Sequence, residues 1–175
     1  MPVHKSAIRL VLEPLVLAVA LALLARTVIH IYAIPSDSMV PTLAVGDHIL
    51  VTAYGGALPS RGDVVVFRSK QSSELLVKRI IALPGDLIES RLGRVVIGGH
   101  TLAERYLAEP AASGTIERQI VPAGCYFVLG DNRARSIDSR KWGVVARSQI
   151  VGRARIVLWS SGPDTPGLRL FRAIE

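Results

Sequence analysis

An apolar segment near the N-terminus constrains this chain more than any other feature. Residues 10–31 read LVLEPLVLAVALALLARTVIHI, which is long enough for a transmembrane helix of about 20 mostly apolar residues. Glu13 and Arg26 interrupt the segment, and the uninterrupted core from Pro14 to Ala25 has only 12 residues. By length alone, that core also fits the apolar region of a cleaved signal peptide or a buried helix.

The two ends of the segment favour a retained membrane anchor. Glu13 and Arg26 lie where their side chains can reach the headgroups of a lipid bilayer, and no small-residue cleavage site with a polar exit follows. Basic residues precede the segment, which places the N-terminus in the cytoplasm. We therefore expect a single-pass anchor in the inner (plasma) membrane over residues 1–33, with residues 34–175 on the outer, periplasmic side.

Composition limits the partners of the remaining chain. The formal net charge of +7 allows nucleic acid or an anionic membrane surface as a partner. No zinc-finger spacing and no helix dense in Arg and Lys favours nucleic acid, so we expect none. The single Cys125 rules out an intrachain disulfide, and its apolar neighbours indicate a buried structural thiol.

After Asp47 the pattern changes to short apolar runs rich in β-branched residues. The runs are HILV, DVVVF, ELLVKRIIAL, RVVIGG, CYFVLG and ARIVLW, and turn residues separate them. No long stretch after residue 40 has a convincing helical period. The fold is therefore expected to be mainly β, an antiparallel β-sheet or partly closed barrel. The polar segment Glu104–Gln119 is expected to be a surface excursion.

Two serines follow the apolar segment in IPSDSMVPTLAVGD, residues 34–47. Ser36 and Ser38 stand between two prolines, where regular helix is excluded, so they form either a structural turn or a nucleophile site. A serine hydroxyl is a weak nucleophile without a neighbouring base. His48 and His100 belong to no recognisable triad motif, although a Ser-His-Asp site stays open. No cluster has metal-ligand spacing, and no cofactor is expected.

Lys78 is the candidate base for such a serine. It stands inside LLVKRIIAL, where both faces of a strand would be apolar around Lys78 and Arg79. Burial lowers the pKa of a lysine, whereas an arginine cannot be deprotonated in practice. Lys78 can therefore accept the proton of Ser38. The alternative is that both side chains reach solvent from an edge strand.

The third stretch, GDNRARSIDSRKWGVV, covers residues 130–145 directly after an apolar strand. It is either a long turn held by Asx bonds and an Asp-Arg pair, or a loop that supports a site at the end of a rigid strand.

Together these stretches resemble the type I signal peptidase family, membrane-bound serine proteases that use a Ser-Lys dyad. IPSDSMVPTLAVGD is similar to the nucleophile box, RGDVVVF to the next strand, VKRIIALPGD to the lysine box and GDNRARSIDSRKWGVV to the C-terminal signature. The resemblance spans about Arg26 to Arg172 and is weakest from GGHTLAERYL to SGTIERQI. That stretch is short beside the insertion of many bacterial members, so a reduced accessory insertion is expected.

The resemblance implies a role for each matching residue. Ser38 would be the nucleophile, Lys78 the general base, and Ser36 an oxyanion donor beside the Ser38 backbone N–H. Ser136 would hydrogen-bond Lys78. The remaining residues implied are an Asp138–Arg140 ion pair and a substrate pocket lined by Tyr32, Ile34, Met39, Leu43, Val66 and Val77. Asp37 replaces a frequent glycine and is expected to turn outward.

The implied function is removal of N-terminal signal peptides from exported preproteins by acyl transfer. Three alternatives stay open. The first is a dedicated Ser-Lys peptidase for a specialised substrate such as a conjugative pilin. The second is a self-cleaving Ser-Lys repressor, which the apolar N-terminus disfavours. The third is a non-catalytic membrane-anchored β-module.

Overall fold

A computed structural model describes residues 7–107, 114–162 and 170–174 of the chain. The side chains of residues 7, 8 and 21–29 also lie outside this description. The chain divides into two compact units, residues 1–30 and residues 31–175, which we call the N-terminal unit and the β-rich unit.

The N-terminal unit contains the helix α1 (Ala7–Val28). Leu and Ala, which favour helix, make up much of its sequence, and Pro14 lies inside it. Arg9 and Glu13 approach to 4.0 Å one turn apart, and both are exposed. In the described part of the chain, no helix combines the length and the apolarity that a bilayer crossing requires. The expected membrane span is therefore not confirmed and stays a prediction.

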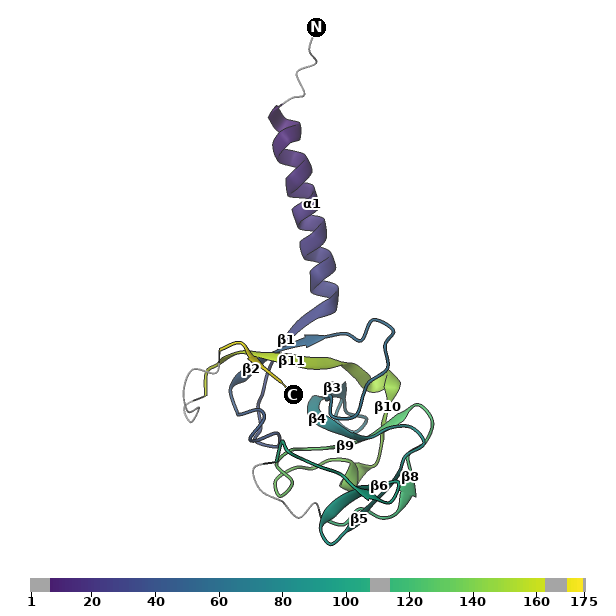
Figure 1. The fold of residues 1–175 in the computed structure, drawn as a ribbon. Coiled ribbons are helices and arrows are strands. Elements are labelled where there is room, and N and C mark those ends of the chain that lie inside the picture. Colours follow the sequence, from purple (N-terminus) through teal and green to yellow (C-terminus); the bar gives the residue numbers. More distant parts are fainter. Residues whose placement is uncertain (1–6, 108–113, 163–169, 175) are drawn as a thin grey trace. The chain divides into compact units, whose positions relative to one another are not determined.

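The β-rich unit is built on one large antiparallel sheet (Figure 1). Its strand order is β1-β2-β11-β3-β4-β9-β10, and β12 also pairs with β11. The bounds are β1 (Ile29–Ala33), β2 (Asp47–Thr52), β3 (Val64–Arg68), β4 (Leu75–Ala82), β9 (Cys125–Leu129), β10 (Val145–Ala146), β11 (Ile150–Ser160) and β12 (Arg172–Ala173). The order is open at β1 and β10, so the expected antiparallel sheet is confirmed and the described strands form no closed barrel. Residues 29–33, expected in the anchor, form a strand.

A smaller sheet has the order β7-β6-β5-β8. Its strands are β5 (Leu87–Arg91), β6 (Arg94–Ile97), β7 (His100–Thr101) and β8 (Gln119–Ile120). Only β7 and β8 fall within residues 98–120, the stretch where a reduced insertion is expected. Ile116 is only 4% exposed and packs in the same cluster as Ile88 and Val95. The expectation of a surface excursion over Glu104–Gln119 is therefore wrong at Ile116, because this apolar side chain completes the core of the small sheet.

The centre of the large sheet is covered on both faces, which explains why its strands lack polar alternation. In β3, Val64 and Val66 belong to one buried cluster, while Val65 and Phe67 belong to another. Val65 is the register partner of Lys78 in β4. This pairing holds a lysine at the centre of a sheet that buries apolar side chains on either side.

Two short helices follow β9 in the same unit. α2 (Ser139–Trp142) leads into β10, and a 3-10 turn, η1 (Arg147–Gln149), leads into β11.

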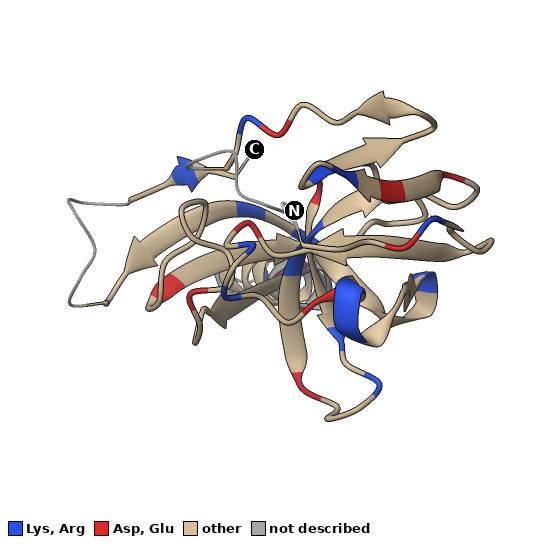
Figure 2. Ribbon diagram, turned by 90° about the horizontal axis from the view of Figure 1, so that it is seen from below, with Lys and Arg blue, Asp and Glu red and all other residues tan. Residues whose placement is uncertain are grey.

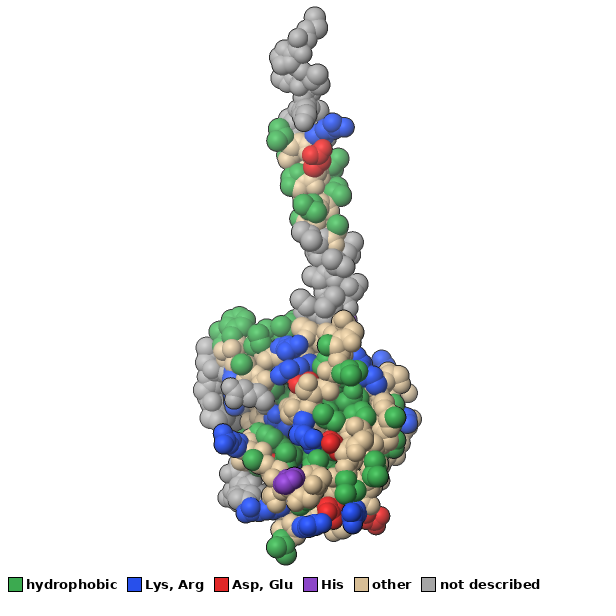
Figure 3. All heavy atoms as spheres, turned by 45° about the vertical axis from the view of Figure 1, so that its right-hand side comes forward, with side chains coloured by type: hydrophobic (Ala, Val, Ile, Leu, Met, Phe, Trp, Pro, Cys, Tyr) green, Lys and Arg blue, Asp and Glu red, His purple; other side chains and the backbone are tan. Residues whose placement is uncertain are grey.

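Charged and apolar side chains share the surface of the β-rich unit. Figure 2 shows Lys and Arg on several strands and loops, with Asp and Glu among them. On the face seen in Figure 3, hydrophobic side chains form patches beside cationic ones. Trp159 is 42% exposed and Phe171 is 69% exposed. Large apolar side chains therefore remain accessible on a basic unit.

Candidate active site

Ser38 lies in a folded-back loop between β1 and β2. The base of the loop is closed by two backbone hydrogen bonds, from Ile34 N–H to the Asp47 carbonyl (2.8 Å) and from Gly46 N–H to the Ile34 carbonyl (2.9 Å). Ser38 is 8% exposed. Pro35 and Pro41 exclude regular helix from this loop. The loop instead forms a turn that carries the buried Ser38 hydroxyl.

Lys78 reaches this hydroxyl from β4. Its Nζ atom donates to Ser38 Oγ at 2.7 Å and to the Val77 carbonyl at 3.0 Å. Lys78 is 4% exposed and Arg79 is 1% exposed. The alternative in which both side chains reach solvent is therefore wrong, because the strand is central and covered on both faces.

Burial determines the chemistry of the Lys78 amine. Loss of hydration lowers the pKa of Lys78 from 10.5 to about 8, and the charges of Asp138 and Asp131 oppose this shift. A substantial fraction of the amine is therefore neutral near pH 8. A neutral amine within hydrogen-bonding distance of a hydroxyl can take its proton during nucleophilic attack.

Ser36 and Asp37 flank the buried hydroxyl differently. Ser36 Oγ lies 3.3 Å from Ser38 Oγ, at the exposed side of the turn. The Asp37 carboxylate instead forms an ion pair with Arg135 at 2.7 Å. Asp37 is thus engaged by another cation and does not act on the Lys78 pKa.

Ser136 does not make the expected contact. Among the described residues, its buried Oγ has no hydrogen-bond partner, so the bond to Lys78 implied by the family resemblance is absent. Ser136 packs instead against Gly130. A Cβ atom on Gly130 would lie 2.3 Å from Ser136 Oγ and 2.4 Å from the Ser38 carbonyl oxygen. Only glycine fits between these two serines.

Asp138 and Arg140 form a two-point ion pair, with distances of 2.7 Å and 2.8 Å from the guanidinium to the two carboxylate oxygens. Asp138 is fully buried and also caps α2. Its Oδ2 accepts the Gly130 N–H at 3.1 Å. The pair therefore fixes the loop that packs against the Ser38 turn.

A cleft of about 100 Å³ opens beside the two polar groups. Five of the six residues expected in the substrate pocket line it, namely Tyr32, Ile34, Met39, Val66 and Val77. Leu43 does not line it, because its side chain is fully buried in the core. The other residues that line it beside Ser38 and Lys78 are Ala33, Pro35, Ser36, Leu75 and Leu76. The cleft is thus apolar, with Ser38 and Lys78 at one side.

Comparisons with known proteins identify the family of the chain. The sequence profile of the family described as Signal peptidase, peptidase S26, matches residues 8–159. The chain belongs to this family. A "Signal peptidase I" from Leptolyngbya laminosa is 41% identical over 154 residues, covering 82% of this chain and 75% of the relative. A "Probable signal peptidase I-2" from Synechocystis sp. is 40% identical over 158 residues, covering 84% and 71%.

A crystal structure of a signal peptidase I from Enterococcus faecalis V583 is similar at 34% identity, with a TM-score of 0.49, and the match covers 55% of this chain and 97% of that chain. The family predicted from the three sequence motifs is confirmed by the profile and the curated relatives.

In this S26 family member, a buried network of charged side chains lies next to the site, and the sequence patterns did not predict it. Arg79 binds the Asp131 carboxylate at 2.9 Å and 2.7 Å, and its guanidinium lies 4.0 Å from the centre of the Tyr106 ring. Arg133 pairs with Glu104 and donates to the Gly130 carbonyl at 3.0 Å. The one signal in the sequence was Arg79 inside an apolar run. Burying an arginine without a partner is costly, so this position predicts a buried acidic partner.

The same S26 site leaves one edge of β4 open. β3 pairs with the whole of Leu75–Arg79, whereas β9 pairs with β4 only from Arg79 onward. Leu75–Lys78 therefore have no described strand on their second side. An extended peptide can add to such an edge, with its backbone passing Ser38 and Lys78.

Proposed function

We propose that this chain is a serine endopeptidase that removes N-terminal signal peptides from exported preproteins. The observation that carries the proposal is the 2.7 Å contact between the Lys78 amine and the Ser38 hydroxyl at the side of an apolar cleft. The names of the curated relatives, signal peptidase I, support the substrate class.

The proposed chemistry is acyl transfer by Ser38 and Lys78. Neutral Lys78 takes the proton of Ser38 as Oγ attacks the scissile carbonyl carbon, and a tetrahedral oxyanion forms. When this intermediate collapses, the peptide C–N bond breaks and the Lys78 ammonium protonates the leaving amine. Lys78 then takes a proton from water, which attacks the ester carbonyl. Collapse of the second intermediate returns the proton to Ser38 and releases the signal peptide.

Two donors are proposed to stabilise the oxyanion, the Ser36 hydroxyl and the Ser38 backbone N–H. The exposed position of Ser36, at 3.3 Å from Ser38 Oγ, supports this role. Asp138 and Arg140 are proposed to hold the loop that supports the Ser38 turn.

The cleft is proposed to bind the first and third residues before the scissile bond. Side chains two positions apart on a strand point to the same side. In a peptide that pairs with the open edge of β4, the side chains of the first and third residues before the scissile bond would therefore both point into the cleft. The small volume of the cleft and its lining by Ile34, Met39 and Val77 favour small apolar side chains there.

We further propose that the N-terminal segment anchors the enzyme in the inner membrane, with residues 34–175 on the outer side. The long apolar run and the basic residues before it support this topology. Ser38 follows residue 31 by seven positions, so the chain itself keeps it within about 25 Å of the end of that run. The exposed Trp159 and Phe171 are suited to an interfacial contact.

The test is cleavage of a signal-peptide-bearing preprotein in detergent by the full chain. Wild type should release the mature protein, and Lys78→Ala and Ser38→Ala should each be nearly inactive. The double variant should be little worse than either, because the two residues act as a unit. Lys141→Ala removes an exposed lysine and is the matched control. Near-normal turnover by Lys78→Arg would show that Lys78 is not the base.

A further inference from the structure

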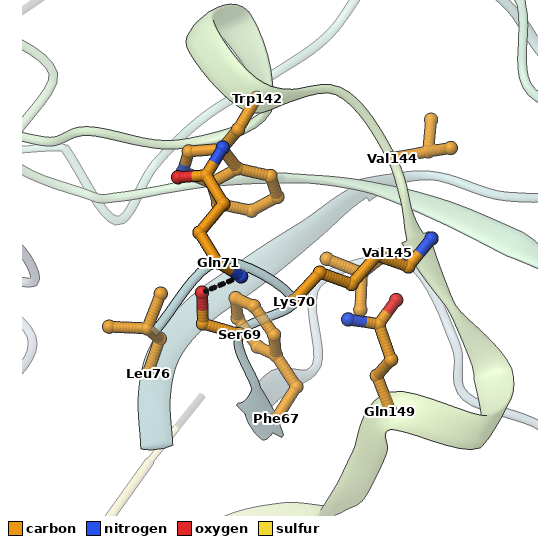
Figure 4. Close-up of a pocket in the computed structure, with 9 residues that line it drawn as sticks. All are labelled: Phe67, Ser69, Lys70, Gln71, Leu76, Trp142, Val144, Val145 and Gln149. Carbon is orange, nitrogen blue, oxygen red and sulfur yellow. Dashed lines mark hydrogen bonds between the residues drawn. The ribbon is translucent and has the colours of Figure 1, made fainter. Parts of the chain in front are cut away.

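A second cavity lies beside the cleft and plays no part in the proposed chemistry. It has a volume of about 140 Å³ and opens between the β3–β4 hairpin and the segment that follows α2. The side chains of Phe67, Leu76 and Trp142 enclose it from three segments of the chain (Figure 4). Phe67 and Trp142 pack at 5.8 Å between ring centres. We call this cavity the hairpin pocket.

The rim of the hairpin pocket is polar and partly fixed. Gln149 accepts the Ala146 N–H and donates to the Arg68 carbonyl, both at 2.9 Å, so it ties β3 to the opposite wall. Lys70 is exposed at the hairpin loop and, within the described ranges, its amine forms no ion pair. The pocket therefore combines an aromatic floor with one free cation at its mouth.

Leu76 connects the hairpin pocket to the cleft, because it lines both. Leu75 and Val77 belong to the core cluster on one face of β4, whereas Leu76 packs with the cluster on the other face. A peptide paired with the open edge of β4 alternates its side chains in the same way. If two of its residues enter the cleft, the residue between them faces the side of Leu76.

We propose that the hairpin pocket is a specificity site for the second residue before the scissile bond. It favours a long side chain with an apolar stem and an acidic tip, since the stem meets Phe67 and Trp142 and the tip meets Lys70. This inference rests on the proposed function and adds to it a substrate preference at one position.

The test uses four preproteins that differ only at this position, with Glu, Lys, Leu or Gly. Wild type should cleave the Glu substrate with a kcat/KM about fivefold above that of the Lys substrate, the size of one partly exposed charge contact. Lys70→Glu should reverse this ratio. Val144→Trp, which narrows the pocket, should lower the kcat/KM of the Leu substrate relative to the Gly substrate.

Arg94→Glu is the matched control, because it makes the same change in charge at an exposed position of the small sheet. It should leave the Glu-to-Lys ratio unchanged. Equal kcat/KM values on all four substrates would overturn the inference, as would equal effects of Lys70→Glu and Arg94→Glu. In both cases wild type still cleaves, so the proposed function stands. If wild type cleaves no preprotein, the proposed function fails and the inference falls with it.

A separate observation concerns Asn132, which touches the Ser38 turn twice. Its backbone N–H donates to the Ser38 carbonyl at 3.0 Å, and its side-chain Nδ2 donates to the Asp37 carbonyl at 3.2 Å. Asn132 thus binds the two peptide groups on either side of the Ser38 Cα atom.

The contact with the Asp37 carbonyl bears on the proposed oxyanion site. A trans peptide group is planar, so the Asp37 C=O and the Ser38 N–H point in opposite directions. In the described structure the Ser38 N–H donates to no acceptor. By holding the carbonyl, the Asn132 amide fixes the direction in which this free N–H points.

We infer that Asn132 is a positioning residue, whose side chain aims the Ser38 N–H at the developing oxyanion. Like the pocket proposal, this rests on the proposed acyl transfer. Because the contact acts on a transition-state donor, its loss should lower kcat and leave KM unchanged.

The test is Asn132→Ala, which removes the side-chain donor and keeps the backbone bond to Ser38. We expect kcat to fall about tenfold, less than the 10²–10³ typical for losing an oxyanion donor itself. KM and the pH midpoint of kcat should not change. Arg135→Ala, which removes the exposed ion pair of Asp37 and leaves its carbonyl contact, should keep kcat.

Thermal denaturation shows whether Asn132→Ala is folded. If it is not, Asn132→Ser supplies the same comparison with a smaller change in polarity. The inference would be overturned if the folded variant kept the wild-type kcat, or if the variant raised KM and left kcat unchanged. Neither result would contradict the proposed roles of Ser38 and Lys78. An inactive wild type would refute the proposed function itself.

Discussion

The amine of Lys78 lies 2.7 Å from the hydroxyl oxygen of Ser38, although the two residues are 40 positions apart in the sequence. A protonated amine at this distance can only donate a hydrogen bond, whereas a neutral amine can accept a proton. Lys78 can therefore act as the base for Ser38 only when its amine is neutral.

The first prediction concerns pH. Because burial lowers the pKa of Lys78 to about 8, kcat/KM should rise about tenfold per pH unit below that value and level off above it. The measurement is preprotein cleavage between pH 6 and pH 10. A flat profile from pH 6 to pH 9 would contradict a lysine base.

The second prediction concerns stability. At pH 7 the Lys78 amine is protonated in both the folded and unfolded states, and burying this charge costs about 3 kcal/mol, from the shift of the pKa from 10.5 to about 8. Lys78→Met removes that cost and should melt at a higher temperature than wild type at pH 7. The cost declines as the pH rises from about 8 to 10.5, so the two melting temperatures should converge above that window. A less stable Lys78→Met at pH 7 would show that the amine is not desolvated.

The third prediction concerns Ser36. Ser36→Ala should lower kcat by about 10²–10³, because one oxyanion donor is lost while the dyad remains. The residual activity should keep the wild-type pH midpoint. Single-turnover kinetics measure this loss directly, and a wild-type rate would exclude Ser36 from the oxyanion site.

The fourth prediction concerns Gly130. Gly130→Ala places a methyl group 2.4 Å from the Ser38 carbonyl and 2.3 Å from Ser136 Oγ, so the Ser38 turn must move. A displacement of this kind should cost at least about 10² in kcat. Gly124→Ala is the control, since its added Cβ meets nothing within 4 Å and tests backbone strain alone. Equal kcat in the two variants would contradict the steric argument.

The fifth prediction concerns the buried Arg79–Asp131 pair. Asp131→Asn leaves the Arg79 charge without its carboxylate and should lower the free energy of unfolding by about 3–5 kcal/mol in urea denaturation. Glu89→Gln breaks the pair with the exposed Arg91 and should cost less than about 1 kcal/mol. Similar losses in the two variants would show that burial adds nothing to the Arg79 pair.

Much of the fold and of the site could be predicted from local patterns. The runs DVVVF and CYFVLG predict strands β3 and β9, because β-branched and aromatic residues bounded by turns favour extended backbone. The motifs around Ser38 and Lys78 were sufficient to predict the family. Strand β5 was not predicted, since LIESR carries too few apolar residues to stand out.

Other features depend on contacts between distant segments, which no local pattern contains. The motif around Leu43 predicted that this residue lines the substrate pocket, but the packing of the core buries it completely. The Ser136 hydroxyl faces Gly130 instead of Lys78, because the direction of the loop after β9 is set by Asp138 and Arg140. The Asn132 contacts arise only when that loop folds over the Ser38 turn.

The sequence by itself determined that a serine and a lysine with the right chemistry occur in S26 motifs, because residue type and order are properties of the chain. Only the tertiary structure decided that the Lys78 amine is shielded from water and 2.7 Å from Ser38. Desolvation and a hydrogen bond require neighbours on every side, and these come from strands and loops that meet only when the chain is folded.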